Sequence, residues 1–302
     1  MIVAVCQEAD GISVASIKHA PAGQPTLQFV GQEACFSTEE RVRAMEQLQQ
    51  QNNLQGSPCV AVLPGHAYQL IQVDMADLSA DECRDAARWQ IRERIDYPSE
   101  EAVIDLFEVA PFGSERKPLT YVVAAQQKIL RERVQLIEQS GLSLESIDIP
   151  EFSLRNICDL FSGDEHGLAV LLLLKQSGVL VVVRDGTLYL VRWLSRGMDD
   201  LIPCADGDFE ALAEKLDSMV LEIQRSFDYC ESTFQLPMVS RLLVAQTQRE
   251  IPAVVSYLDD YLATRVESFS FADVLTVPDD SDQLSLNQNL LVIGGALRQE
   301  KN

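Results

Sequence analysis

The chain has 302 residues, 47% of them hydrophobic, and can therefore bury a substantial core as one bilobal domain or two fused ones. It contains 24 lysine and arginine residues against 46 aspartate and glutamate residues, which gives a formal net charge of −22. A surface of this sign repels phosphate backbones and anionic lipid headgroups. We therefore expect neither nucleic-acid binding nor direct membrane insertion.

Cysteine and histidine residues form no spaced metal-binding motif. The seven cysteines are scattered and never occur as Cys-x-x-Cys, so free, mostly buried thiols of a reducing compartment explain them better than a zinc site or a disulfide framework. His19, His66 and His166 are far apart in the sequence, and each is better explained as a surface or loop residue. No metal site is predicted.

The apolar segments are too short to cross a bilayer. Residues 1–6 lack the basic start and the longer apolar region of a signal peptide. The most apolar window, residues 168–183, is interrupted by Lys-Gln-Ser-Gly at 175–178, whereas a membrane span needs about 20 apolar residues. Two strands joined by a tight turn explain this window better, and we expect a soluble intracellular chain.

The first half alternates strands and helices. Apolar alternation and turn residues predict strands at 2–6, 12–18, 26–30, 60–63, 69–73, 102–109 and 119–125. Helical periodicity predicts helices at 38–51, 79–95, 129–140 and 151–161. Ser37 and Glu40 provide the capping pattern for the first of these helices.

The helix at 79–95 is amphipathic and ends where Pro98 forbids its continuation. Its apolar side chains on or near one face are Ala86, Trp89, Ile91 and Ile95. A helix with such a face must pack against a sheet or another helix.

The second half repeats this plan after a polar, glycine-containing loop at 162–167, which is the best domain boundary. We expect a three-stranded meander at 168–174, 178–184 and 188–193, a long helix at 209–229, a strand at 241–245, a helix at 251–263 and a last apolar helix at 290–298. Each half thus opens with antiparallel strands and then supplies helices, which indicates a duplicated α/β architecture.

Five blocks, in the same order along the chain, resemble the PilM-like family of type IV pilus and type II secretion assembly. The blocks are 81–105 with its Tyr-Pro-Ser-Glu-Glu turn, 121–155, 188–197, the Glu-Ile-Gln-Arg-Ser helix at 222–226, and Gly-Gly-Ala-Leu-Arg at 294–298. No single block is specific, but together they span most of the chain. In its length, its acidity and its lack of a membrane helix, the chain resembles the branch of this family that serves mannose-sensitive haemagglutinin (MSHA) pili.

The resemblance implies an α/β, actin-like fold of two ribonuclease H-like lobes. Residues 1–65 and 149–167 would form the first-lobe core, which the helix at 290–298 completes. Residues 66–148 would form a subdomain inserted into that lobe, and residues 168–289 would form the second lobe. Little sequence separates Gly197 from Phe209, so the usual small subdomain of the second lobe should be reduced.

The three loops that would hold a nucleotide in this fold are all altered. In the first hairpin turn, at 5–11, Val5, Cys6 and Gln7 replace the expected Asp-x-Gly, although Asp10-Gly11 lies nearby; the second turn, at 173–178, also lacks the acid. The loop after the strand at 241–245 is Gln-Thr-Gln-Arg, with no glycine to let a base approach. We expect no cofactor and no catalysis.

The resemblance implies a scaffold that binds the cytoplasmic tail of a PilN-like inner-membrane protein in a cleft between the first-lobe core and the insert. The scaffold would also bind other pilus-assembly components. The chain would be cytoplasmic, held at the inner membrane by its partners. Candidate groove residues are Trp89, Tyr97, Phe152 and Arg155, although the aromatic ones could equally serve the core. The alternatives are an ATP-binding actin-like switch and, more remotely, a sugar-kinase-like enzyme; the oligomeric state stays open.

Overall fold

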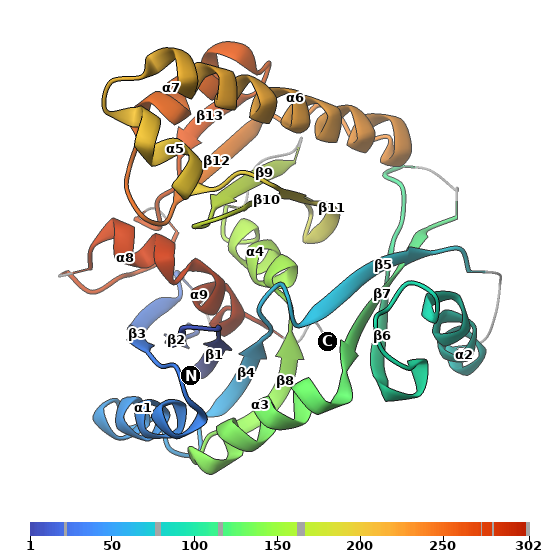
Figure 1. Cartoon of the computed structure of the whole chain (residues 1–302), viewed down its shortest axis with the longest axis vertical. Helices are drawn as coiled ribbons and strands as arrows, with labels where there is room; N and C mark the ends of the chain where they lie inside the picture. The colour runs from blue at the N-terminus through green and yellow to red at the C-terminus, as the bar shows by residue number, and fades with distance from the viewer. Residues whose placement is uncertain are drawn as a thin grey trace.

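A computed structural model describes residues 1–20, 23–75, 80–113, 117–161, 167–272, 274–279 and 281–299. Residues 162–166 of the predicted domain-boundary loop, which include His166, lie outside these residues. The described strands form two five-stranded sheets and one three-stranded sheet, arranged as two lobes with an insert beside the first (Figure 1).

The first lobe is built on a mixed sheet of order β3-β2-β1-β4-β8, whose strands are β1 (Ile2–Gln7), β2 (Gly11–Lys18), β3 (Thr26–Ala34), β4 (Pro58–Val62) and β8 (Ser143–Asp148). The first three strands are antiparallel, whereas β4 and β8 continue the sheet in parallel with β1. Strand alternation sends Val3 and Val5 to one face, under α1 (Thr38–Gln51) and α3 (Gln127–Gln139). It sends Ala4 and Cys6 to the other face.

The second lobe repeats this plan with the order β11-β10-β9-β12-β13. Its strands are β9 (Leu168–Leu173), β10 (Gly178–Arg184), β11 (Thr187–Leu194), β12 (Arg241–Gln246) and β13 (Arg265–Ser268). Helices α6 (Phe209–Phe234) and α7 (Pro252–Tyr261) cover its outer face. One short helix, α5 (Met198–Ala205), stands between β11 and α6. The duplicated lobes and the reduced subdomain that the sequence predicts are both confirmed.

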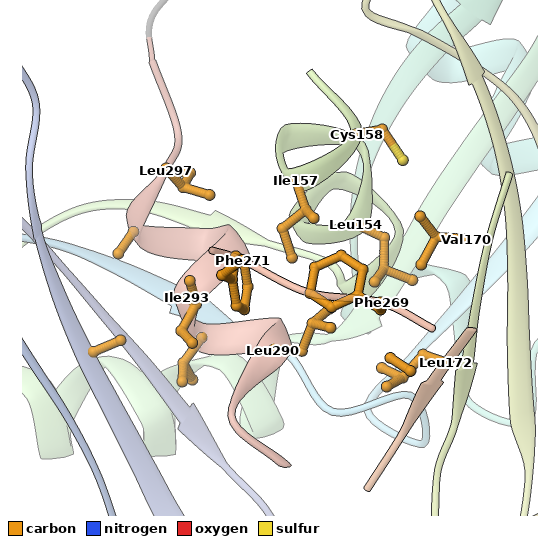
Figure 2. Packing of buried hydrophobic residues seen from close by; sticks show 14 of the residues in the cluster. Leu154, Ile157, Cys158, Val170, Leu172, Phe269, Phe271, Leu290, Ile293 and Leu297 are labelled. Atoms are coloured by element: carbon orange, nitrogen blue, oxygen red, sulfur yellow. The ribbon is translucent and has the colours of Figure 1, made fainter. Parts of the chain in front are cut away.

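The two sheets share a core made by α4 (Pro150–Cys158) and α9 (Leu290–Ala296), which pack against each other between the lobes. Figure 2 shows Leu154 and Ile157 of α4 meeting Leu290 and Ile293 of α9, with Val170 and Leu172 of β9 and two phenylalanines, Phe269 and Phe271, beside them. The helix α8 (Gln283–Gln288) leads into α9. The C-terminal helix is therefore part of the hydrophobic core that joins the lobes.

The insert is a sheet of order β5-β7-β6, made of β5 (Tyr68–Val73), β6 (Ala102–Val109) and β7 (Leu119–Gln126), with α2 (Ala80–Ile91) and a 3-10 turn at Ser99–Glu101. The expected range of 66–148 is too long, because α3 and β8 return to the first lobe. The strand β8 pairs in parallel with β4, and such a pair needs a long crossover, which the insert and α3 provide. The insert therefore ends at Gln126.

Two further predictions need adjustment. The helix predicted at 79–95 ends at Ile91, where the Arg94 N–H donates to the Ile91 carbonyl and tightens the last turn. Ala87 and Ile91 are buried, whereas Trp89 points to solvent, so the predicted apolar face was wrong at Trp89.

Among the described residues, no helix has the length and apolar content to cross a membrane.

Candidate functional site

The first hairpin turn of each lobe lines a cavity of about 610 Å³, which lies in the cleft between the two lobes. The turn between β1 and β2 contributes Glu8 and Asp10, and the turn between β9 and β10 contributes Gln176 and Ser177. Partial desolvation and then the Asp10 carboxylate raise the pKa of Glu8. Among the described side chains that line this cleft, none is a lysine or an arginine. A phosphate group would therefore meet two carboxylates there and no fixed cation.

The loop after β12 is closed by its own hydrogen bonds. The Gln246 side chain is buried, accepts from the Ile251 N–H at 3.0 Å and donates back to the Ile251 carbonyl at 3.4 Å. The Asn287 amide donates to the Gln246 carbonyl at 3.1 Å, and the Thr247 hydroxyl donates to the Leu173 carbonyl at 2.8 Å. The Gln246 side chain and carbonyl and the Thr247 hydroxyl are thus already engaged within the chain.

The outer end of the same loop is fixed by an ion pair. Arg249 donates through both of its terminal nitrogens to the two carboxylate oxygens of Asp206, at 2.5 and 2.6 Å. This side-chain bond holds the pKa of Asp206 below its ordinary value. The pair ties the loop to the segment that follows α5 across the edge of the second lobe.

Glu151 joins the lobes and the insert at one point. Its side chain is fully buried at the start of α4 and accepts from the Tyr68 hydroxyl at 2.5 Å and from the Trp193 indole N–H at 3.2 Å. Burial raises the pKa of Glu151, although both hydrogen bonds oppose that shift. The Trp193 ring also lies against Gly65, where a Cβ would come within 3.1 Å of it. One carboxylate therefore connects β5, α4 and β11.

The sheet of the insert has one face under α2 and one face turned toward the lobes, which we call the inner face. Strand pairing and alternation define the inner face by Tyr68, Leu70, Gln72, Val103, Asp105, Phe107, Tyr121, Val123 and Ala125. A cavity of about 230 Å³ opens between this face, β11 and Tyr229 of α6. Its walls are mainly aromatic and aliphatic, with Arg192 as the charged group among its described lining residues.

Aromatic contacts run from this cavity to α4. The ring of Phe107 stacks on Tyr121 with centroids 5.3 Å apart, and it meets the edge of Phe152 at 5.0 Å. The Arg155 guanidinium lies over Phe152 at 4.8 Å. Burial, and then the neighbouring Tyr229 with its hydrogen bond, raise the pKa of Tyr121. The inner face thus holds rigid aromatic side chains of the kind that anchor a partner.

The four predicted groove residues occupy two separate places. Phe152 and Arg155 come together beside the inner face, and the buried Arg155 Nε has no acceptor among the described residues. Trp89 is 65% exposed on α2, where Arg92 lies over its ring, and Tyr97 packs into the core beneath α2. The sheet of the insert separates the two pairs. The structure does not bring the four together in one groove.

The sequence analysis assigned no role to Phe107, Tyr121, Glu151 or Trp193. The alternation in β6 and β7 does place Phe107 and Tyr121 on a common face of an antiparallel pair, and this signal could have found them. No sequence signal assigns Glu151 its two donors, because they come from strands 83 residues before it and 42 residues after it.

Three solved structures have similar folds. The PilM–PilN type IV pilus biogenesis complex matches 98% of this chain and 97% of its own matched chain at 18% identity, with a TM-score of 0.75. The cytoplasmic domain of EpsL, an inner-membrane component of the type II secretion system of Vibrio cholerae, matches 96% and 93% at 10% identity, with a TM-score of 0.52. A Bacteroides thetaiotaomicron protein with an actin-like ATPase fold and unknown function matches 96% and 95% at 8% identity, with a TM-score of 0.50.

No protein-family model matches the chain, and comparison with curated protein sequences finds no match. The three structural matches span almost the whole length of both partners in each pair, and they show that the chain has the actin-like fold.

Proposed function

We propose that this chain is a non-catalytic scaffold of a type IV pilus assembly, bound to the cytoplasmic tail of a PilN-like inner-membrane protein. The observation that carries this proposal is the end-to-end structural similarity to the PilM–PilN complex, with a TM-score of 0.75. The similarity to the EpsL domain, from a related class of assembly, supports the same context. The chain acts at the cytoplasmic side of the inner membrane, where the tail and other assembly components hold it.

The inner face of the insert is the surface that suits such a tail. An extended segment can place an apolar side chain in the cavity beside Phe107 and Tyr121, because aromatic walls supply contact area at low entropic cost. Asp105 lies two residues from Phe107 on the same face, and Val103 beyond it is 44% exposed. A tail with apolar residues flanking a basic one would match this order.

The expected cleft between the first-lobe core and the insert is occupied at its base by packed side chains. Leu63, Ala67, Tyr68, Ala125 and Ile149 are all buried there in one cluster. The tail therefore lies on the inner face toward Phe152 and the second lobe, and does not enter between β4 and β5.

The runner-up is an ATP-binding switch on the same fold. The acidic cleft and the self-bonded loop after β12 favour the scaffold. Before a nucleotide could bind, the loop would have to break its own hydrogen bonds, and the phosphates would have to lie beside the carboxylates of the cleft. The finer assignment within the pilus systems is to the MSHA type, as an MshI-like protein, on the basis of length and acidity.

The test is fluorescence anisotropy with a labelled peptide copied from the cytoplasmic tail of the PilN-like protein of the same organism. Phe152→Ala and Arg155→Glu should abolish binding while circular dichroism shows a retained fold. Val103→Glu, which removes an exposed apolar side chain, should weaken binding about tenfold without loss of packing. Leu221→Glu, at a comparably exposed site on α6, is the matched control. Full affinity in Phe152→Ala, Arg155→Glu and Val103→Glu would refute this placement.

A further inference from the structure

A second cavity, of about 380 Å³, lies on the first lobe between α1, α3 and the turn that joins β1 to β2. Its lining includes two arginines, Arg41 of α1 and Arg133 of α3, together with His66. In a chain of net charge −22, two guanidinium groups that share one small cavity are an unusual concentration of positive charge. The tail-binding proposal does not use any of these side chains.

The two guanidinium groups are incompletely paired. The Nε atoms of Arg41 and Arg133 are buried and have no hydrogen-bond acceptor among the described residues. Arg41 donates to the carbonyls of Glu8 and Ala9 at 2.9 and 2.8 Å, and Arg133 donates to the Ile129 carbonyl at 3.2 Å. Neither arginine forms an ion pair with a carboxylate in the described part of the chain. The N–H donors of the two arginines are therefore not all matched by acceptors that the described residues supply.

The two cations also act on each other. Burial lowers the pKa of Arg133; Cys6 and then Glu132 oppose that shift, and the nearby Arg41 guanidinium adds a smaller lowering. Two like charges at the wall of one cavity are relieved when an anion lies between them. A guanidinium presents parallel N–H donors whose spacing fits the oxygens of a phosphate or a carboxylate.

Two carboxylates border the same cavity and have to be weighed against this. Glu8 and Glu132 both line it, yet both side chains reach solvent, whereas the arginine Nε atoms do not. The N-terminus of α1 is already satisfied, because Ser37 and Glu40 form its capping box. The local attraction for an anion therefore comes from the two guanidinium groups and not from the helix end.

We propose that this cavity binds a small oxyanion, held by the guanidinium groups of Arg41 and Arg133 at the junction of α1, α3 and the first hairpin turn. The ligand carries a phosphate or a carboxylate group, either as a free metabolite-sized molecule or as an acidic side chain. The volume of the cavity falls at the lower end of the range for small-molecule pockets. A bound anion would stabilise the contact of the first hairpin turn, to which Arg41 already donates hydrogen bonds, with the helices α1 and α3.

Thermal unfolding with added anions tests this site on the full chain. Inorganic phosphate and glutarate are each compared with chloride at constant ionic strength, and we expect one or both to raise the Tm in a saturable way. In Arg133→Gln the apparent affinity should fall about tenfold or more, because charge-assisted hydrogen bonds are lost. In Arg131→Gln, which makes the same charge change at an exposed position on the same helix, it should stay within about twofold.

The response to each probe also identifies the ligand class. A stronger response to phosphate assigns a phosphate-bearing ligand, and a stronger response to glutarate assigns a carboxylate. Equal loss in the two variants, or no saturable stabilisation by either anion, would overturn the proposal.

A direct readout covers the case in which Arg133→Gln does not fold. The arginine Nε–Hε signals in ¹H–¹⁵N spectra of the unmodified chain, assigned with Arg133→Lys, should shift for Arg41 and Arg133 on titration with the stabilising anion. Unmoved signals at both residues would equally overturn it.

Discussion

The interlobe cleft and the inner face of the insert meet at Glu151, yet they differ in what they leave available to a ligand. In the cleft, the groups near the expected nucleotide position include the carboxylates of Glu8 and Asp10 and the Gln246 side chain, which is already bonded within the chain. On the inner face, Phe107 and Tyr121 border an open cavity.

This difference indicates which surface the chain has kept for a partner. A buried hydrogen bond within a loop must be broken before a ligand can replace it, so a self-bonded loop resists binding. A rigid aromatic wall loses little conformational freedom when it is covered, so it favours binding. The predictions below test whether the two regions differ in this way.

The largest expected effect is the loss of Glu151, which supports both regions. Glu151→Ala leaves the buried Tyr68 hydroxyl without its acceptor and removes the link to Trp193, so we expect the free energy of unfolding to fall by about 3 kcal/mol. Urea titration measures this change. Glu145→Ala, at an exposed carboxylate on β8, should change it by less than about 0.5 kcal/mol. A small effect at Glu151 would mean that the two regions are not coupled through it.

The same carboxylate makes stability depend on pH. Burial raises the pKa of Glu151 above its ordinary value of 4.5, so the folded chain binds this proton more tightly than the unfolded chain. The contribution of Glu151 is therefore greatest below its unfolded pKa and is lost as the pH rises through the folded pKa. Relative to Glu151→Gln, the unmodified chain should lose stability as the pH rises above 4.5. A constant difference across this range would contradict the raised pKa.

A medium effect is expected at Asp105, the carboxylate of the inner face. Asp105→Lys should weaken tail binding about tenfold at low salt, and the difference should shrink as salt increases, because the interaction is exposed and screened. Glu231→Lys, the same charge reversal at an exposed site near the end of α6, controls for net charge. Equal losses in the two variants would show that the overall charge of the chain, and not the inner face, attracts the tail.

Local signals predicted most elements of the fold, because they act over a few residues. The helix α1 starts and ends as expected, since its capping box and periodicity are contained within residues 37–51. The strand β8 was missed because its sequence, Ser-Leu-Glu-Ser-Ile-Asp, is only weakly apolar and its pairing with β4 spans the whole insert. Non-local pairing leaves little trace in a short segment.

The site was less predictable for the same reason. Periodicity identified α2 but not the neighbour of each of its sides, and Trp89 was therefore placed on the apolar face although it points to solvent. Phe152 and Arg155 were chosen from a family block, and the structure places them beside Phe107, 45 residues away in sequence. Which aromatic rings meet across the inner face depends on how the insert returns to the first lobe.

A small effect is expected at Trp89, which lies on the α2 side of the insert. Trp89→Ala removes a side chain that is already 65% exposed, so tail affinity should change by less than about twofold. The anisotropy titration used for the inner-face variants measures this directly. A loss as large as that of Val103→Glu would move the binding surface to α2 and remove the contrast between the two faces of the sheet.

The adenosine part of ATP is expected to add nothing to the thermal stability of the chain through the cleft. Magnesium-ATP at millimolar concentration should raise the Tm no more than tripolyphosphate does, because the start of the loop after β12 is closed by its own hydrogen bonds and the turns offer the phosphates two carboxylates. Any response that ATP and tripolyphosphate share should disappear in Arg133→Gln, which assigns it to the cavity of Arg41 and Arg133. A response to ATP that exceeds tripolyphosphate and persists in Arg133→Gln would show that the cleft opens for nucleotide, and the switch would then replace the scaffold as the better account of the chain.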